Sequence, residues 1–187
     1  MENLVVWQDS GMPTVSEINA KCQDSGHSVE FDSTIEMFNH TGYLPAKLDG
    51  HETGFEFYYL SKDSPDLIEL DPYFKDSQGV MSVTRGDFRE NLVALIFLQA
   101  VSQLTDGAYL GLSFDIAKNS ADTPGYLQSE IEGMRVEVER EERKAAERLE
   151  RQKARSETEG PPPLHSEQKA APKSKGSFWS RLFGLDQ

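Results

Sequence analysis

Cysteine is almost absent from this sequence, because Cys22 is the single thiol in 187 residues. One thiol excludes an internal disulfide, and this usage is typical of a reducing compartment. The first ten residues, MENLVVWQDS, show no basic stretch followed by an apolar one, and no apolar run approaches the length of about 18 residues that a membrane helix needs. We therefore expect a soluble, cytoplasmic protein.

Motifs for metal, phosphate or nucleophilic chemistry are missing as well. The four histidines (His27, His40, His51 and His165) lack the spacing of metal ligands, and Cys22 has no CxxC partner. Neither GxGxxG nor GxxxxGK[ST] occurs. We interpret Cys22 and His27 as a core thiol and a surface imidazole rather than as a nucleophile and its base. The sequence predicts no cofactor, no metal site and no enzymatic activity.

Negative charge is abundant and unevenly distributed. The chain has 19 Lys and Arg against 32 Asp and Glu, a formal net charge of −13. Up to Met134 there are 7 basic and 22 acidic residues, a net charge of −15, whereas the remainder has 12 and 10, a net charge of +2. An acidic surface repels nucleic acid and anionic lipid and attracts basic partners. Solubility alone is the other explanation for this charge.

Hydrophobic periodicity predicts an α+β fold, a small antiparallel or mixed sheet packed on a central apolar helix. In the stretch GFEFYYL, Phe55, Phe57 and Tyr59 alternate with Glu56 and Tyr58, which predicts a strand with two different faces. An almost wholly apolar helix is expected over 87–105, with Asp87 and Glu90 in its first turn and Gly107 at its end. Strands are expected over 3–7, 28–31, 55–60, 80–84 and 109–116.

Two shorter helices and one hairpin complete the expected domain. The stretch PTVSEINAKC predicts a helix that begins near Pro13 and ends before Gly26. In DSTIEMFNHTG, Asp32 or Ser33 would cap a second short helix. The pair Asp49 and Gly50 favours a turn or hairpin before the strand over 55–60.

The composition divides the chain into four parts. We predict an acidic α+β globular domain over 1–125, a long charged helix over 126–157, a disordered Pro- and Lys-rich linker over 158–176 and an amphipathic aromatic motif over 177–187. The helix is a solvated helix or a weak coiled coil, with Glu139 and Glu147 each placed four residues before an arginine.

The last part, FWSRLFGL, is basic and aromatic and too short to form a stable helix by itself in water. It would fold against a membrane surface, a partner protein or its own acidic domain. The residues expected to make this contact are Phe178, Trp179, Arg181, Leu182 and Phe183.

A second group of expected contact residues surrounds the acidic segment SKDSPDLIELDPYFKD. Aromatic side chains ringed by charge are typical of protein interfaces. Because the segment lacks the ligand order of an EF-hand, we interpret it as solvated rather than calcium-binding. The expected partner-binding residues here are Tyr58, Tyr59, Asp63, Asp66, Glu69, Asp71 and Tyr73.

The segment HTGYLPAKLDGHETGFEFYYL, followed by an apolar helix ending AVSQLTDGAYL, resembles small bacterial immunity proteins that neutralise secreted polymorphic toxins. The resemblance spans residues 40–115 and implies a single α+β domain that binds and occludes a toxin in the cytoplasm. It assigns no individual functional residue.

The expected function is therefore that of a protein-binding inhibitor of a basic toxin such as a nuclease. The alternative is an adaptor or scaffold that docks to a partner or a membrane surface through FWSRLFGL. We expect no nucleic-acid partner, and the sequence leaves the oligomeric state open.

Overall fold

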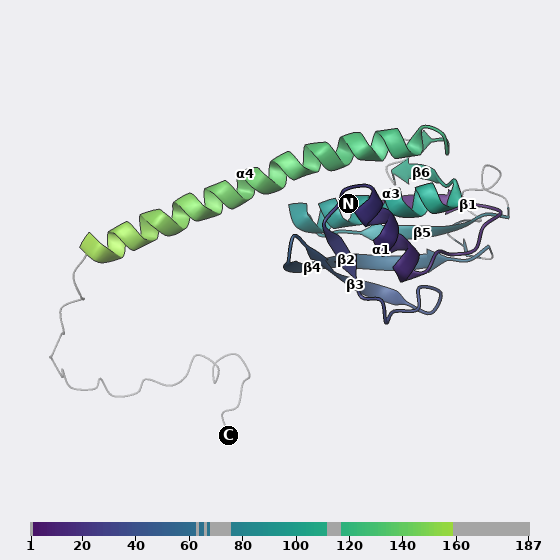
Figure 1. Ribbon diagram of the computed structural model, residues 1–187, viewed down its shortest axis with the longest axis horizontal. Helices are drawn as coiled ribbons and strands as arrows, with labels where there is room; N and C mark the ends of the chain where they lie inside the picture. Colours follow the sequence, from purple (N-terminus) through teal and green to yellow (C-terminus); the bar gives the residue numbers. More distant parts are fainter. Residues whose placement is uncertain (1, 63, 66, 68–75, 112–116, 159–187) are drawn as a thin grey trace, which may run out of the picture. The chain divides into compact units, whose positions relative to one another are not determined.

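The computed structural model describes residues 2–62, 64, 65, 67, 76–111 and 117–158. In these ranges the strands are β1 (Glu2–Trp7), β2 (Val29–Phe31), β3 (Thr41–Leu48), β4 (His51–Leu60), β5 (Gln78–Val83), β6 (Ala108–Gly111) and β7 (Ala117–Lys118), and the helices are α1 (Val15–Asp24), α3 (Phe88–Thr105) and α4 (Thr123–Thr158). The strands form one sheet in the order β2-β3-β4-β5-β1-β6-β7, with antiparallel pairing between the described neighbours (Figure 1). The predicted α+β fold is confirmed.

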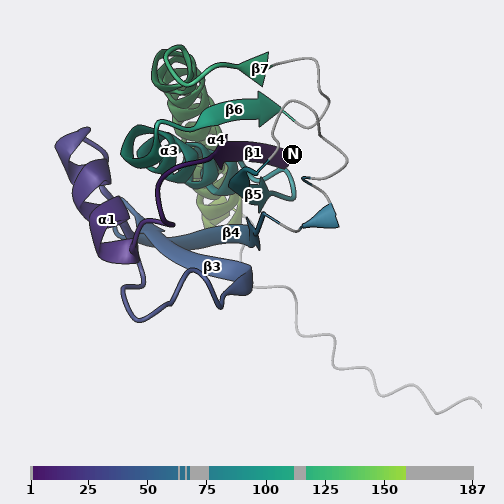
Figure 2. The ribbon, with the colours of Figure 1, turned by 90° about the vertical axis from the view of Figure 1, so that its right-hand side faces the viewer.

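Helix α3 forms the centre of the core, as the sequence predicts. Its N-cap is Asp87, whose side chain accepts hydrogen bonds from the first free N–H groups of the helix. Its side chain Phe97 meets Phe31, Phe55 and Phe57 edge to face, with ring centroids 5.4, 5.3 and 5.7 Å apart. Figure 2 shows α1 and α3 on the same side of the sheet. We call this side the helix face and the opposite side the outer face.

Helix α1 also closes the free edge of β2. Thr14 and Glu17 form a reciprocal capping box at the start of α1, which stabilises its position beside the sheet. Asn19 then reaches Phe31 of β2: the Phe31 N–H donates to Asn19 Oδ1 at 2.8 Å, and Asn19 Nδ2 donates to the Phe31 carbonyl at 2.9 Å. Because these bonds replace those of a neighbouring strand, this edge is protected from pairing with another chain.

The structure corrects two local predictions. Residues 32–40 form turns instead of the expected short helix, because Asp32 Oδ1 accepts hydrogen bonds from both the N–H and the hydroxyl of Thr34. The hairpin predicted at Asp49 and Gly50 is present, but β3, which precedes it, was not predicted as a full strand. Pro45 lies opposite Gly54 of β4, and β2 pairs only with Ala46–Leu48, so on the side of β3 that faces β2 no strand requires an N–H at Pro45.

Helix α3 ends differently from the prediction. Asp106, not Gly107, adopts the left-handed conformation, with a φ angle of 51°. A side chain at Gly107 would collide with β1, because its Cβ would lie 2.6 Å from Val5 Cγ1. Gly107 therefore permits close packing of the chain on β1.

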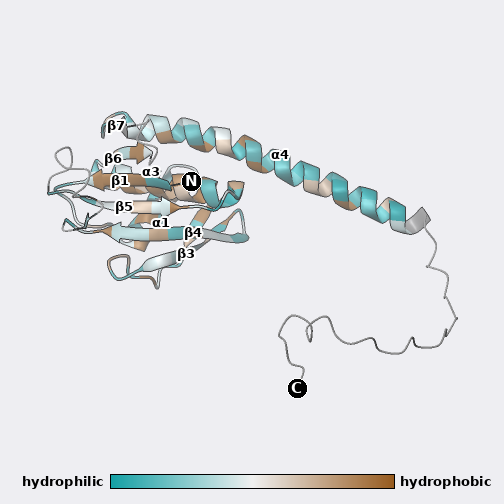
Figure 3. Ribbon diagram, turned by 180° about the vertical axis from the view of Figure 1, so that it is seen from behind, coloured by the Kyte–Doolittle hydropathy of each residue, from teal (hydrophilic) through white to brown (hydrophobic). Residues whose placement is uncertain are grey.

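Helix α4 is longer than expected, and only its first part belongs to the domain. The chain divides into two compact units between Ala146 and Glu147. In the first unit, Leu127, Ile131 and Val138 are buried in the core. The described side chains over 147–156 are exposed. In Figure 3 most of the second part of α4 has hydrophilic colours.

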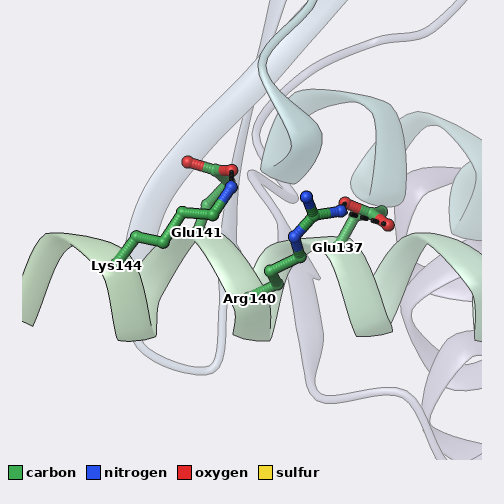
Figure 4. A network of polar contacts seen from close by, with 4 residues as sticks. All are labelled: Glu137, Arg140, Glu141 and Lys144. Carbon is green, nitrogen blue, oxygen red and sulfur yellow. Dashed lines mark hydrogen bonds and ion pairs between the residues drawn. The ribbon is translucent and has the colours of Figure 1, made fainter.

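Ion pairs on α4 follow a spacing of three residues rather than the expected four. Glu137 pairs with Arg140 at 3.1 Å and Glu141 pairs with Lys144 at 2.6 Å (Figure 4). Their side chains are between 38 % and 60 % exposed, so water screens both pairs and each contributes little to stability. Among the described residues, no helix is both long and apolar enough to cross a membrane. The predicted linker from Glu159 onward and the aromatic motif lie outside the described residues.

Candidate protein-interaction surface

The register of the sheet brings aromatic and acidic side chains together on the outer face. One row across the strands contains Tyr43, Glu56 and Val83, which are direct neighbours on β3, β4 and β5. The next row contains Tyr58 and Met81 on β4 and β5. We call these five residues the outer-face band. Tyr43 is exposed and the other four are half-buried. Tyr58 and Met81 also pack against a buried cluster on the same face, made of Leu4, Val6, Leu60, Leu67 and Leu110.

Tyr43 is the most exposed member of the band, at 55 % of its surface. Its ring lies over Gly54, where an added Cβ would be 2.6 Å from Tyr43 Cζ. The absence of a side chain at Gly54 therefore allows the ring to lie along the sheet. Partial burial, followed by the charges of Glu90 and Glu52, raises the pKa of Tyr43. The Tyr43 hydroxyl thus stays protonated at neutral pH and can donate a hydrogen bond.

Tyr58 is coupled to the carboxylate of Glu56. The Tyr58 hydroxyl donates a hydrogen bond to Glu56 Oε2 at 3.3 Å, and the Glu56 charge raises the pKa of Tyr58. Arg85 forms an ion pair with the other oxygen of Glu56. The Arg85 side chain is 80 % exposed, whereas that of Glu56 is 27 % exposed, so the arginine is the more readily displaced of the two.

Acidic side chains also flank the band. Glu2 is paired with Val83 in the register and is exposed. Glu52 forms an exposed ion pair with Lys47 at 3.4 Å. Two tyrosines therefore lie within a frame of carboxylates that is only partly neutralised by basic side chains. Aromatic residues at the centre of a charged rim are typical of protein-binding surfaces.

The structure separates two residues that the sequence analysis grouped together. Tyr58 lies on the outer face, whereas Tyr59 packs against the core of the helix face. The Tyr59 hydroxyl donates to Gln78 Oε1 at 2.6 Å, and its ring meets Phe38 edge to face at 5.2 Å. Successive side chains of a strand point to opposite faces, so the two tyrosines cannot contribute to one flat surface.

The remaining predicted contact residues cannot be placed on this surface, because they lie outside the described residues. These residues are Asp63, Asp66, Glu69, Asp71, Tyr73, Phe178, Trp179, Arg181, Leu182 and Phe183. The prediction that they contact a partner stays a prediction.

Tyr43 was missed by the sequence analysis, although a signal for it was present. The hairpin predicted at Asp49 and Gly50 fixes which residues of β3 and β4 are opposite each other. Counting outward from that turn pairs Tyr43 with Glu56, on the same face as Tyr58. The irregular alternation before the turn obscured this relation.

The predicted core thiol is confirmed, and the predicted surface imidazole is wrong. Cys22 is buried, and its burial raises the pKa of the thiol to about 12, so the thiolate is disfavoured at neutral pH. His27 is also buried, with 6 % of its surface exposed. Within the described parts of the chain, no cluster of three His, Cys, Asp or Glu side chains is arranged to hold a metal ion.

Comparisons of the chain with protein-family models, with curated proteins and with solved structures give no match.

Proposed function

We propose that the chain is a non-enzymatic protein-binding module, an immunity-type inhibitor that occludes a basic toxin such as a nuclease in the bacterial cytoplasm. The observation that carries this proposal is the outer-face band, in which Tyr43 and Tyr58 lie beside Glu56 on a sheet face. The resemblance of residues 40–115 to immunity proteins favours the same function.

The charge of the domain supports a basic partner. The part up to Met134 has a net charge of −15, which accelerates the approach of a cationic protein and aligns complementary surfaces. Carboxylates on the inhibitor would occupy the sites that a nuclease uses for phosphates. Tyr43 and Tyr58 would supply contact area at a low cost in side-chain entropy.

The experiment is capture from a bacterial lysate by the full chain, compared with the double variant Tyr43→Ser and Tyr58→Ser. The matched control is Val136→Ser, which removes a side chain that is 61 % exposed on α4. The proposal predicts a basic protein that is captured by the wild type and the control but lost with the double variant. Capture should weaken between about 0.1 M and about 1 M salt.

A captured protein supports the proposal only if direct binding and inhibition follow. The purified partner is mixed with the full chain at equal concentration, and its toxicity or nuclease activity is measured. Loss of that activity with the wild type but not with the double variant is the expected result. A neutral or acidic partner, or one that the double variant still inhibits, contradicts the proposal.

The alternative adaptor function depends on residues 177–187, which the structure does not describe. A chain that ends at Gly160 distinguishes the two functions in the same assay. An inhibitor of the proposed kind retains its partner after this truncation. Loss of all capture, or movement of only the full chain to the membrane fraction, would favour the adaptor.

A further inference from the structure

His27 occupies a fixed position directly after α1. The Gly26 N–H donates to the carbonyl of Gln23 and the His27 N–H donates to that of Cys22, each at 2.9 Å. These two bonds, with Gly26 at a φ angle of 77°, form a Schellman motif. The motif places the buried His27 ring within hydrogen-bonding distance of both α3 and α4.

Gln99 of α3 determines the role of one ring nitrogen. Its Nε2 donates to the carbonyl of Pro124 at 3.2 Å and to Gln128 Oε1 at 3.0 Å, both on α4. Because a carbonyl oxygen can only accept, the nitrogen of the Gln99 amide faces α4 and its oxygen faces His27. The His27 Nε2 lies 3.0 Å from that oxygen. His27 Nε2 therefore carries a proton and donates.

Arg135 of α4 determines the role of the other ring nitrogen. Its Nη2 lies 3.2 Å from His27 Nδ1. A guanidinium has donors and no acceptor, so His27 Nδ1 must accept this hydrogen bond through its lone pair. The two contacts together require the neutral ring with its proton on Nε2.

Protonation of His27 would break this arrangement. A second N–H would then point at the guanidinium of Arg135, and two positive charges would meet at a contact that is partly buried. The charged groups near the ring are of both signs, so they would offset this repulsion only in part. Glu30 and Lys47 line the pocket beside His27. Arg135 shares its own pocket with Asp49, His51, Arg89, Glu139 and Glu142.

We propose that the protonation of His27 controls how firmly the first part of α4 packs on the core. In its neutral form the ring links the end of α1 to α3 and α4 through a polar network that is buried at Gln99 and partly buried at Arg135. When His27 binds a proton, Arg135 is repelled and the segment containing Leu127, Ile131 and Val138 packs less firmly on the core. This inference does not depend on the proposed inhibitor function, because it concerns contacts within the domain.

Hydrogen exchange of the full chain tests whether the packing of α4 depends on the charge of His27. The protection of backbone amides over 127–138 is measured at pH 8 and pH 5.5, which span the range in which histidine generally changes charge. Rates are corrected for the intrinsic pH dependence of exchange. We expect the protection to fall about tenfold at the lower pH, consistent with the loss of one hydrogen bond. Equal protection at both pH values overturns the proposal.

Matched variants separate His27 from other titrating groups. His27→Gln retains a donor toward Gln99 but cannot titrate, so its protection over 127–138 should be independent of pH in this range. His51→Gln changes an exposed histidine in the pocket of Arg135 and should retain the wild-type response. A response that disappears with His51→Gln instead would assign the effect to His51 and overturn the proposal.

Arg135→Met provides a test that does not alter the histidine. It removes the repelling charge, so protection should be lower than in the wild type at pH 8 but should change less toward pH 5.5. A purely structural role for Arg135 would lower protection equally at both pH values. Ring nitrogen shifts in an NMR spectrum at pH 8 should show the proton of His27 on Nε2, and a proton on Nδ1 would contradict the geometry.

Discussion

On the helix face of the sheet, Phe55 and Phe57 of β4 are fully buried against Phe97, whereas on the outer face Glu56 and Tyr58 of the same strand are half-exposed. One strand thus supplies both the centre of the core and the middle of the candidate interaction surface. The two faces should respond differently to mutation. Changes to the aromatic core of the helix face should affect stability, and changes to the outer-face band should mainly affect binding. The outer face also has buried residues, Leu4, Val6, Leu60 and Leu110, and changes to these should affect stability.

Phe97→Ala should have the largest effect, because Phe97 contacts aromatic rings from both β2 and β4. The loss of packing and the remaining cavity should lower the free energy of unfolding by about 3–5 kcal/mol. Denaturant unfolding of the full chain measures this loss. Phe38→Ala removes an aromatic ring that is 57 % exposed and should cost much less. Phe38 packs on Tyr59 of the helix face, so this pair compares buried with exposed rings on one side of the sheet. Equal losses for the two variants would show that burial in the core does not determine the cost.

Gly54→Ala should have an intermediate effect on stability. It tests an outer-face position where a change should destabilise the fold because the space above it is filled by Tyr43. The new methyl group would meet the ring of Tyr43 and the backbone of β3, which should cost about 1–3 kcal/mol of stability. The control is Gly133→Ala on α4, where a Cβ has open space and should stabilise by about 0.5–1 kcal/mol. The same chemical change should therefore have opposite signs at the two positions in denaturant unfolding.

Arg85→Ala should have the smallest effect on stability. The Arg85 ion pair with Glu56 is exposed on the arginine side, so its removal should change the free energy of unfolding by less than about 0.5 kcal/mol. A double-mutant cycle with Glu56→Gln measures the coupling between the two side chains. A coupling of several kcal/mol would show that the outer-face band itself stabilises the fold and would weaken the distinction.

Local sequence patterns predicted most of the architecture. The alternation in GFEFYYL assigned Phe57 and Tyr58 to opposite faces, and the apolar run ending at Leu104 predicted the central helix. These predictions succeeded because burial on one face imposes a period of two on a strand, and burial all round removes polar residues from a helix.

Other features could not be predicted from hydrophobic periodicity. Asp32 was expected to cap a helix, but its side chain closes a local turn with Thr34. The strand β3 tolerates Pro45 because its neighbour β2 is short. No local pattern shows that Asn19 bonds to Phe31, since that contact requires α1 to lie beside β2.

The sequence by itself determined the α+β class, the two faces of β4 and the acidic character of the domain, because each depends on local periodicity or on composition. Tertiary structure decided which surface residues meet. It placed Tyr43 beside Glu56, put Tyr58 and Tyr59 in different environments, and buried His27 between Gln99 and Arg135. The physical reason is that strand register and helix docking bring distant residues into contact, and these contacts fix the charge and hydrogen bonds of each side chain.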